Sequence, residues 1–520
     1  MDTDKLQIFI TMTCYIAFVI GIGVFFMKRS NKNSDEFFLG GRSLGPWVAA
    51  FSAEASDMSG WLLMGLPGVA YWCGLADASW TAIGLAVGTY LNWLIVGKRL
   101  RNYSVVANNS ITIPDFFSNR FRENKKIIML VTSVFILVFF TVYAASCFVT
   151  CGKLFSTLFD IKYIYMMIAG AVFVLIYTFI GGFLAESVSD FVQAIVMIIA
   201  LCTVVITGVV HAGGISAVID NVKNIPGFLE FFSMASPGLD ADGTQMIVNE
   251  APVFGEAASY GLLTILSTCA WGLGYFGMPQ VLLRFMAIRK PKELTQARRI
   301  AIIWVIISLA AAVIIGVIGR SIAPVDLLTN SSAENIFITL STKLLPPLLA
   351  GVVMAGILAA TISSSDSYLL IAASALAKNV FQGIAKKNAT DKQVMLVTRI
   401  TLVVITIIGV IIALDENSII FNIVSFAWAG FGATFGPVLL FSLFWKRINR
   451  AGALAGMLSG AGMVFLWKLL IKGFGGIFGI YELLPAFIIS CLFIIVVSLI
   501  TKAPSDELNA DFEKAKLVQE

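Results

Sequence analysis

Residues 52–68 read SAEASDMSGWLLMGLPG and lie within an apolar run that is long enough to cross a bilayer. An acidic residue at the centre of a membrane helix costs roughly 2.5–3.5 kcal/mol, so it usually has a partner or lines a polar path. This run carries two such residues, Glu54 and Asp57, among serines and glycines that weaken a helix. Backbone that opens at membrane depth survives only inside protein or beside a water-filled cavity. The stretch therefore predicts a broken helix with a cation and substrate site, as in secondary transporters.

The composition excludes an ordinary soluble domain. Of 520 residues, 58% are hydrophobic and only 13% are charged, whereas soluble domains are about 25% charged. A membrane helix needs about 20 apolar residues. The pattern therefore predicts an all-α polytopic membrane protein with thirteen spans, at residues 6–27, 46–72, 76–97, 127–152, 162–182, 189–211, 256–283, 297–320, 345–377, 396–414, 419–445, 451–471 and 480–501.

Basic residues are distributed unevenly among the predicted loops. Most of the 36 Lys and Arg fall after odd-numbered spans or in the tail, and Arg284 is counted beside the basic loop that follows the seventh span. By the positive-inside rule we expect an outside N-terminus and a cytoplasmic C-terminus in the plasma membrane. This distribution accounts for the net charge of +5, so no nucleic-acid partner is expected. The tail, residues 503–520, has the mixed charges of a short solvated helix.

A second stretch also predicts an interrupted helix. Residues 267–280 read STCAWGLGYFGMPQ, in which Gly272, Gly274, Gly277 and Pro279 cluster. Each of the two stretches opens a group of five spans, and an odd number inverts the second copy, as an inverted-repeat transporter requires. We expect a single transporter domain, 1–520, with repeats at 46–211 and 256–445 and two additional helices at 451–501. The alternative is a pair of Gly-rich packing helices, which leaves the buried acids unexplained.

The ninth predicted span presents a face of oxygen ligands. Within AGILAATISSSDSYLL, residues 355–370, the spacing i, i+3, i+4 places Ala360, Ser363 and Ser364 on one face. Together with opened carbonyls near Ala55 and Met58, these groups predict a sodium cage. In the alternative, the serines bond back to their own helix or join helices. The run of three serines before an acid favours the site.

A second face of this span repeats the geometry. Ser363, Asp366 and Ser367 again have the spacing i, i+3, i+4, and Asp190 begins the sixth span. If Asp190 and Asp366 approach one another, they would hold a second cation. Otherwise one of them is protonated, or Asp366 pairs with another cation, because intramembrane acids need a partner.

The chain resembles the sodium/solute symporter family from about residue 35 to residue 504. The resemblance rests on collinear motifs, namely LGGRSLGPW, SDMSGWLLMGLPG, FFTVYAAS, YTFIGGFLA, WGLGYFGMPQVLLRFMA, RRI and SFAWAGFGATFGPVLLFS. It is closest to the proline carriers of bacteria. It implies thirteen helices, of which the second to the eleventh form a leucine-transporter-like five-plus-five core with broken helices 2 and 7. It also implies sodium ligands at Ala55, Met58, Ala360, Ser363 and Ser364.

The resemblance extends to two acids and shows two departures. It implies that Asp57 is important for sodium use and that Asp190 is linked to a further ion position. Asp366 replaces a serine or threonine that is usual at that position, which leaves the sodium stoichiometry open. Glu54 stands where a small residue such as Gly is usual.

For the substrate, the resemblance implies Tyr143 on the fourth span and Trp271, Tyr275 and Pro279 on the seventh. Aromatic rings would enclose a pyrrolidine ring, and a half-helix N-terminus would receive the carboxylate. We therefore expect sodium-coupled import of L-proline. Membrane lipid is an expected partner of the protein, whereas an organic cofactor and an obligate protein partner are not expected. Another small solute (amino acid, carboxylate or sugar), proton coupling or a receptor role remains open. An enzyme is disfavoured because the acids lack a His, a metal-ligand cluster or a nucleophile motif.

Overall fold

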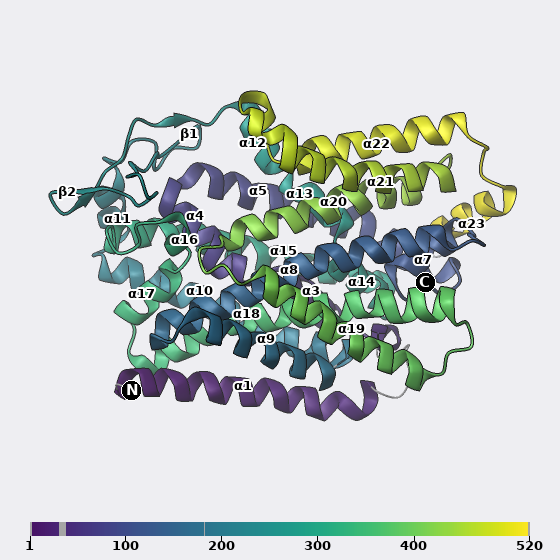
Figure 1. Cartoon of the computed structure of the whole chain (residues 1–520), viewed down its shortest axis with the longest axis horizontal. Coiled ribbons are helices and arrows are strands. Elements are labelled where there is room, and N and C mark those ends of the chain that lie inside the picture. The colour runs from purple at the N-terminus through teal and green to yellow at the C-terminus, as the bar shows by residue number, and fades with distance from the viewer. Residues whose placement is uncertain (1–2, 31–37, 181, 518–520) are drawn as a thin grey trace.

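The chain forms a bundle of helices that run roughly along one common direction (Figure 1). The structure is a computed structural model that describes residues 3–30, 38–180 and 182–517. The first half of the chain forms α1 (Thr3–Ser30), η1 (Gly40–Arg42), α3 (Pro46–Asp57), η2 (Trp61–Gly65), α4 (Leu66–Cys73), α5 (Leu75–Leu91), η3 (Asn92–Val96), α6 (Gly97–Val106), α7 (Ile113–Arg120), α8 (Ile127–Phe159), α9 (Tyr163–Ile180), α10 (Phe183–His211) and α11 (Ile215–Val222).

Two short antiparallel sheets interrupt the helices, since β1 (Ser233–Met234) pairs with β4 (Ala258–Ser259) and β2 (Ile247–Val248) pairs with β3 (Ala251–Pro252). The second half of the chain is again helical. It forms α12 (Leu262–Cys269), α13 (Trp271–Gly274), η4 (Tyr275–Gly277), α14 (Pro279–Ala287), η5 (Pro291–Glu293), α15 (Leu294–Ile322), α16 (Asn330–Ala333), α17 (Ile336–Leu344), α18 (Pro347–Ser374), η6 (Ala375–Ala385), α19 (Asp391–Ile412), α20 (Ile420–Phe444), α21 (Arg450–Leu466), η7 (Trp467–Ile471), η8 (Lys472–Phe474), η9 (Gly476–Gly479), α22 (Leu483–Ile500) and α23 (Asp506–Leu517).

Within the described residues, eleven helical segments are long and apolar enough to cross a membrane. Two shorter apolar segments, Trp61–Cys73 and Leu262–Gly277, lie where the second and seventh spans were predicted to break. The all-α membrane architecture is therefore confirmed. The total of thirteen spans stays a prediction, because the two divided segments fall short of a full span as single helices.

Burial separates the central helices from the peripheral ones. In the most apolar window of α18 and of α20, 83% of the residues are buried, against 22% in α1 and 33% in α19. A helix that is apolar all round can be covered by protein or by lipid, so the sequence alone does not rank the spans by depth. The structure places α18, which carries the predicted sodium serines, at the centre.

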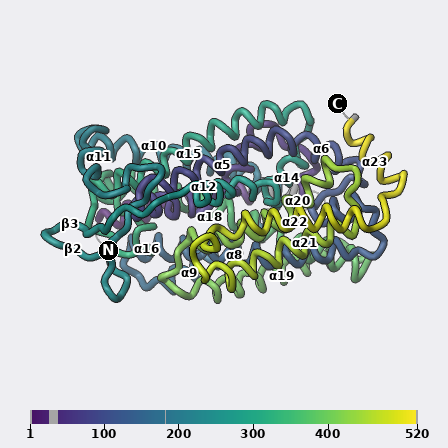
Figure 2. The backbone as a smooth tube through the Cα atoms, turned by 90° about the horizontal axis from the view of Figure 1, so that it is seen from above, coloured from purple at the N-terminus to yellow at the C-terminus, as the bar shows by residue number. Residues whose placement is uncertain are grey.

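The two ends of the bundle differ. The strands and α11 gather at the end near the N-terminus, and the C-terminus lies at the opposite end in both views (Figures 1 and 2). The tail forms α23, as predicted, but the expectation of a solvated helix is wrong for one face. Phe512 is only 2% exposed, and the guanidinium groups of Arg99 and Arg120 lie 5.2 and 5.6 Å from its ring centroid. The apolar side of α23 therefore packs on the bundle.

Candidate functional site

Helical geometry ends within the acidic stretch at residues 52–68. α3 ends at Asp57, and Met58 has φ −83° and ψ 73°. The Ser59 N–H, which would bond to the Ala55 carbonyl in a continuous helix, donates instead to the Asp57 carbonyl at 3.0 Å. Gly60 follows because a Cβ there would lie 2.3 Å from Oγ1 of Thr150 on α8. The break thus directs the Ala55 carbonyl to partners outside its own helix.

Two serines of α18 supply those partners. The Ser363 hydroxyl donates to the Ala55 carbonyl at 2.8 Å and the Ser364 hydroxyl donates to it at 3.2 Å. Ser363 also donates to the Ala360 carbonyl at 3.2 Å. Four of the five predicted sodium ligands are joined by these bonds, and Met58 lies at the break itself; all five are fully buried. Carbonyl and hydroxyl oxygens are the ligands that hard cations prefer, so the chemistry fits sodium.

The neighbouring Ser365 differs from Ser363 and Ser364 in its partners. Its hydroxyl donates to the Thr361 carbonyl at 2.6 Å, within its own helix. Ser365 therefore bonds only to its own helix, whereas Ser363 and Ser364 also join α18 to α3. Serines that join helices belong to the alternative as well, so the sodium cage stays a prediction. The two bridging residues are the ones that the spacing selected.

Asp57 connects the two interrupted segments. One of its carboxylate oxygens accepts from the Tyr275 hydroxyl at 2.8 Å, and the other accepts from the Gln280 amide at 3.2 Å. Its backbone carbonyl accepts from the Tyr143 hydroxyl at 3.4 Å. Tyr275 belongs to η4, and the backbone is extended at Met278, with φ −79° and ψ 108°, before Pro279 begins α14. Gln280 was missed as a candidate, although it stands in the quoted motif.

Trp271 and Tyr275, two of the predicted substrate aromatics, belong to one buried aromatic cluster. The ring centroid of Trp271 lies 5.2 Å from those of Phe421 and Tyr481. Tyr275 meets Trp428 edge-on at 5.0 Å. Trp428 also donates its indole N–H to the Trp271 carbonyl at 2.8 Å. Trp428 was missed as a candidate, although it stands in the motif quoted from residues 425–442.

Tyr143 lies on another side of Asp57, within α8. Its ring centroid is 4.2 Å from that of Tyr368 on α18. Tyr368 directly follows Ser367 on the helix that carries the predicted sodium serines. Tyr143 therefore contacts α3 through the Asp57 carbonyl, and it contacts α18 through the ring of Tyr368.

A buried arginine lies among the residues of the predicted second ion site. Arg284 was counted beside a basic loop, and that placement is wrong, because the residue lies in α14 and is 0% exposed. Its Nη2 donates to Glu186, to Asp190 at 3.2 Å and to Ser367 at 3.0 Å. Its Nε donates to the Ser52 hydroxyl at 3.0 Å. Desolvated carboxylates need such a partner, and Arg284 is the partner of Glu186 and Asp190.

Asp366 is not bonded to Asp190 directly. Its Oδ1 accepts from the Ser367 N–H at 2.8 Å. Its Oδ2 is buried without a hydrogen-bond partner among the residues that the structure describes. The structure therefore brings Asp190 and Ser367 together around Arg284 and leaves Asp366 beside them.

Glu54, the other departure, pairs with a tryptophan. Its Oε1 accepts from the indole N–H of Trp93 in η3 at 3.1 Å, and the residue is 1% exposed. It lies on α3 one turn before Asp57 but points to a different partner. The sequence contains no local signal for the pairing of Glu54 with Trp93, because the two residues lie far apart in the chain.

Comparison with protein families places this geometry in context. The family model described as "Sodium:solute symporter family" matches residues 37–460. Among curated proteins, a sodium/proline symporter of Haemophilus influenzae is 42% identical over 514 residues, which cover 98% of this chain and 97% of that protein. A sodium/proline symporter of Staphylococcus aureus is 39% identical over 516 residues and is covered to 96% of its length.

Solved structures share the fold at lower identity. A Na+-coupled sialic acid symporter in a substrate-bound outward-open state aligns with a TM-score of 0.74 at 18% identity, covering 96% of this chain and 99% of that one. Mhp1, a nucleobase-cation-symport-1 family transporter, aligns with a TM-score of 0.51 at 11% identity and covers 92% of this chain and 98% of its own. The helices are thus arranged in the leucine-transporter-like manner that the family resemblance implied.

Proposed function

Because the chain belongs to the sodium:solute symporter family, we propose that it imports L-proline into the cell together with sodium. The family consists of transporters rather than enzymes, and the chain is a multi-pass membrane protein. Support for proline comes from relatives with the sodium/proline symporter name, which are 39–42% identical along nearly their whole length. Sodium is the co-transported ion, and membrane lipid is the only other partner that the proposal needs.

One observation carries the coupling between ion and solute. The Asp57 carboxylate accepts from Tyr275 at 2.8 Å, and two residues earlier in α3 the Ala55 carbonyl accepts from Ser363 at 2.8 Å. Sodium at the cage and proline beside Tyr275 would therefore act on the same end of α3. Two ligands that favour one conformation must raise each other's affinity by the same factor.

The proposed cycle follows from this arrangement. Sodium binds to the oxygens of Ala55, Met58, Ala360, Ser363 and Ser364 and holds α3 against α18. Proline then binds among Tyr143, Trp271, Tyr275 and Pro279, where an aromatic wall stabilises its ammonium by about 0.5–2 kcal/mol. The loaded protein closes outside and opens inside, and the ion leaves into a cytosol of low sodium concentration.

The proposed topology has an outside N-terminus, a cytoplasmic C-terminus and location in the plasma membrane. It also comprises inverted repeats at residues 46–211 and 256–445, followed by two helices at 451–501. Supporting observations are the divided segments that open each repeat and the termini at opposite ends of the bundle (Figure 1). An odd number of crossings separates the termini in this way.

Of the residues Asp190, Asp366 and Ser367, which were predicted to hold a second sodium ion, the proposal keeps only Asp366 as a ligand. Arg284 already donates to Asp190 and Ser367. Asp366 then remains as the acid available to a further cation beside Ser363. The stoichiometry therefore depends on whether Asp366 takes part, and a reversal-potential measurement of the sodium to proline ratio in Asp366→Asn and in the parent would decide it.

Competition for uptake tests the choice of solute. Uptake of labelled L-proline into liposomes that contain the purified protein is measured in a sodium gradient, with a tenfold excess of unlabelled amino acids, carboxylates or sugars. L-proline and close analogues should compete, and the others should not. Stronger competition by a different solute would assign the same fold to that solute, and uptake that follows a proton gradient instead of sodium would reject sodium coupling.

A further inference from the structure

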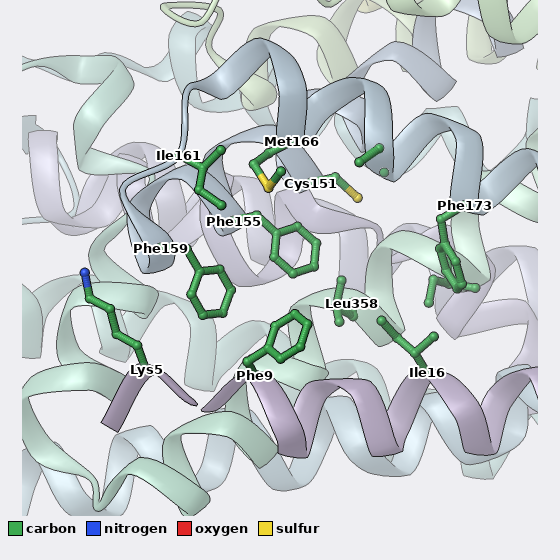
Figure 3. A pocket seen from close by; sticks show the side chains of 13 residues that line it. Lys5, Phe9, Ile16, Cys151, Phe155, Phe159, Ile161, Met166, Phe173 and Leu358 are labelled. Carbon is green, nitrogen blue, oxygen red and sulfur yellow. The ribbon is translucent and has the colours of Figure 1, made fainter. Parts of the chain in front are cut away.

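A largely apolar cavity lies outside the transport site, between α1, α8, α9 and α18 (Figure 3). Its volume is about 800 Å³. Phe9 and Ile16 line it from α1, and Phe155 lines it from α8. Phe9 is 47% exposed and Ile161, at the turn between α8 and α9, is 42% exposed, so the cavity opens at the surface of the bundle. None of the residues assigned to sodium or proline lines it.

The length of the cavity matches one leaflet of a bilayer. Its α1 wall extends from Lys5 to Ile16, a separation of about 16 Å at 1.5 Å per residue. The hydrocarbon core of a bilayer is about 30 Å thick, so this wall covers about half of it. Lys5 stands at the N-terminal end of the wall, while Phe9, Phe155 and Phe159 point toward one another farther in (Figure 3).

We propose that this cavity binds an acyl chain of a phospholipid from the leaflet that faces the N-terminus of α1, with the lipid phosphate at Lys5. Lys5 is the charged residue among those that line the cavity. Its ammonium group has three donors, and the exposed Asp160 takes one of them. A phosphate oxygen would share the Lys5 ammonium with Asp160 and accept from its remaining donors, while the acyl chain fills the apolar cavity. Water would be a poor occupant because an apolar lining offers it few hydrogen-bond partners.

The innermost wall gives the lipid a connection to transport. Leu358 and Ile362 of α18 line the cavity. On the same helix, Ala360 lies between them and Ser363 directly follows Ile362. An acyl chain against Leu358 and Ile362 therefore supports the helix that presents serines to α3. This inference rests on the membrane location of the chain and does not depend on which solute is carried.

Native mass spectrometry of the full-length protein from nanodiscs of phosphatidylglycerol and diacylglycerol tests the site. The parent should retain phosphatidylglycerol and not diacylglycerol, which has the chains without the phosphate. Ala169→Trp should lose the retained lipid, since Ala169 lines the cavity. Ala310→Trp is the matched control, because Ala310 is likewise exposed, on α15 and away from the cavity. Lys5→Gln should abolish the preference for phosphatidylglycerol.

Ile161→Trp at the mouth of the cavity is a second blocking variant if Ala169→Trp does not fold. A parent that retains no phospholipid would overturn the proposal. So would equal retention by the parent and a folded blocking variant, or equal loss in Ala310→Trp. Failure of sodium-driven uptake would leave this test unaffected, because the readout is bound lipid.

Discussion

Removing the Ser363 hydroxyl should weaken sodium binding far more than proline binding. Ser363→Ala deletes the hydroxyl that donates to the Ala55 carbonyl at 2.8 Å and to the Ala360 carbonyl at 3.2 Å. In the sodium-bound protein the same oxygen would face the ion. The methyl group that remains fits the buried space, so the substitution removes a ligand without adding volume.

The magnitude follows from the difference between these two roles. An interaction with a charged partner contributes about 1.5–3 kcal/mol, whereas a neutral hydrogen bond contributes about 0.5–1.5 kcal/mol. The variant therefore loses about 1–1.5 kcal/mol more in the sodium-bound state than in the sodium-free state. Because 1.4 kcal/mol corresponds to a factor of ten, we expect apparent sodium affinity to fall about fivefold to tenfold.

The assay is the sodium dependence of proline uptake in proteoliposomes, with proline affinity extrapolated to saturating sodium. Ser365→Ala is the matched control, because Ser365 is equally buried in α18 but donates only to carbonyls of its own helix. That variant should retain the parental sodium affinity. If Ser363→Ala and Ser365→Ala have the same sodium affinity, Ser363 does not belong to the cage.

Three further changes separate the remaining parts of the account. Tyr275→Phe deletes the donor to Asp57 and should weaken sodium and proline together, by about 1.5–3 kcal/mol of a charge-assisted bond, as sodium- and proline-dependent uptake would reveal. Arg284→Gln leaves buried acids without a cation and should cost about 3–5 kcal/mol of stability, measured as a lower Tm in detergent. Gly60→Ala places a Cβ against Thr150 and should cost about 1–3 kcal/mol by overpacking, read from the same unfolding curves.

Each of these changes has a control. Tyr163→Phe removes a hydroxyl that donates to the Ala413 carbonyl, remote from Asp57, and should leave both affinities unchanged. Glu186→Gln should restore part of the stability lost in Arg284→Gln, because it removes one of the uncompensated charges. Gly462→Ala meets nothing within 4 Å and should be tolerated. Unchanged Tm in Arg284→Gln, or equal effects of the two glycine changes, would contradict the reasoning.

Local sequence signals were sufficient for the broad fold and for the two serines that join α18 to α3. Acids, serines and glycines in an apolar run marked the break after Asp57, because each is unfavourable in a simple membrane helix. The i, i+3, i+4 spacing selected Ser363 and Ser364, which bridge to α3, although Ser365 has the same chemistry. Helical periodicity is a short-range property and is visible in one sequence.

Long-range pairings could not be predicted in the same way. Arg284 ends an apolar stretch beside further basic residues, and only the tertiary structure brings it to Glu186 and Asp190, about a hundred positions earlier. The pairing of Glu54 with Trp93 and the packing of Trp428 on Trp271 also depend on which helices adjoin. Apolar spans look alike in sequence whether they face protein or lipid, so these neighbours carry no local signal.

Accumulation of labelled L-proline in liposomes that contain the purified protein tests the central claim most directly. An inward sodium gradient is imposed at clamped voltage and pH, and the internal proline concentration is compared with that of the bath. The account predicts that proline rises above the bath concentration only when the sodium gradient is present. Equilibration without accumulation, or accumulation that is independent of sodium in vesicles shown to contain folded protein, would contradict it.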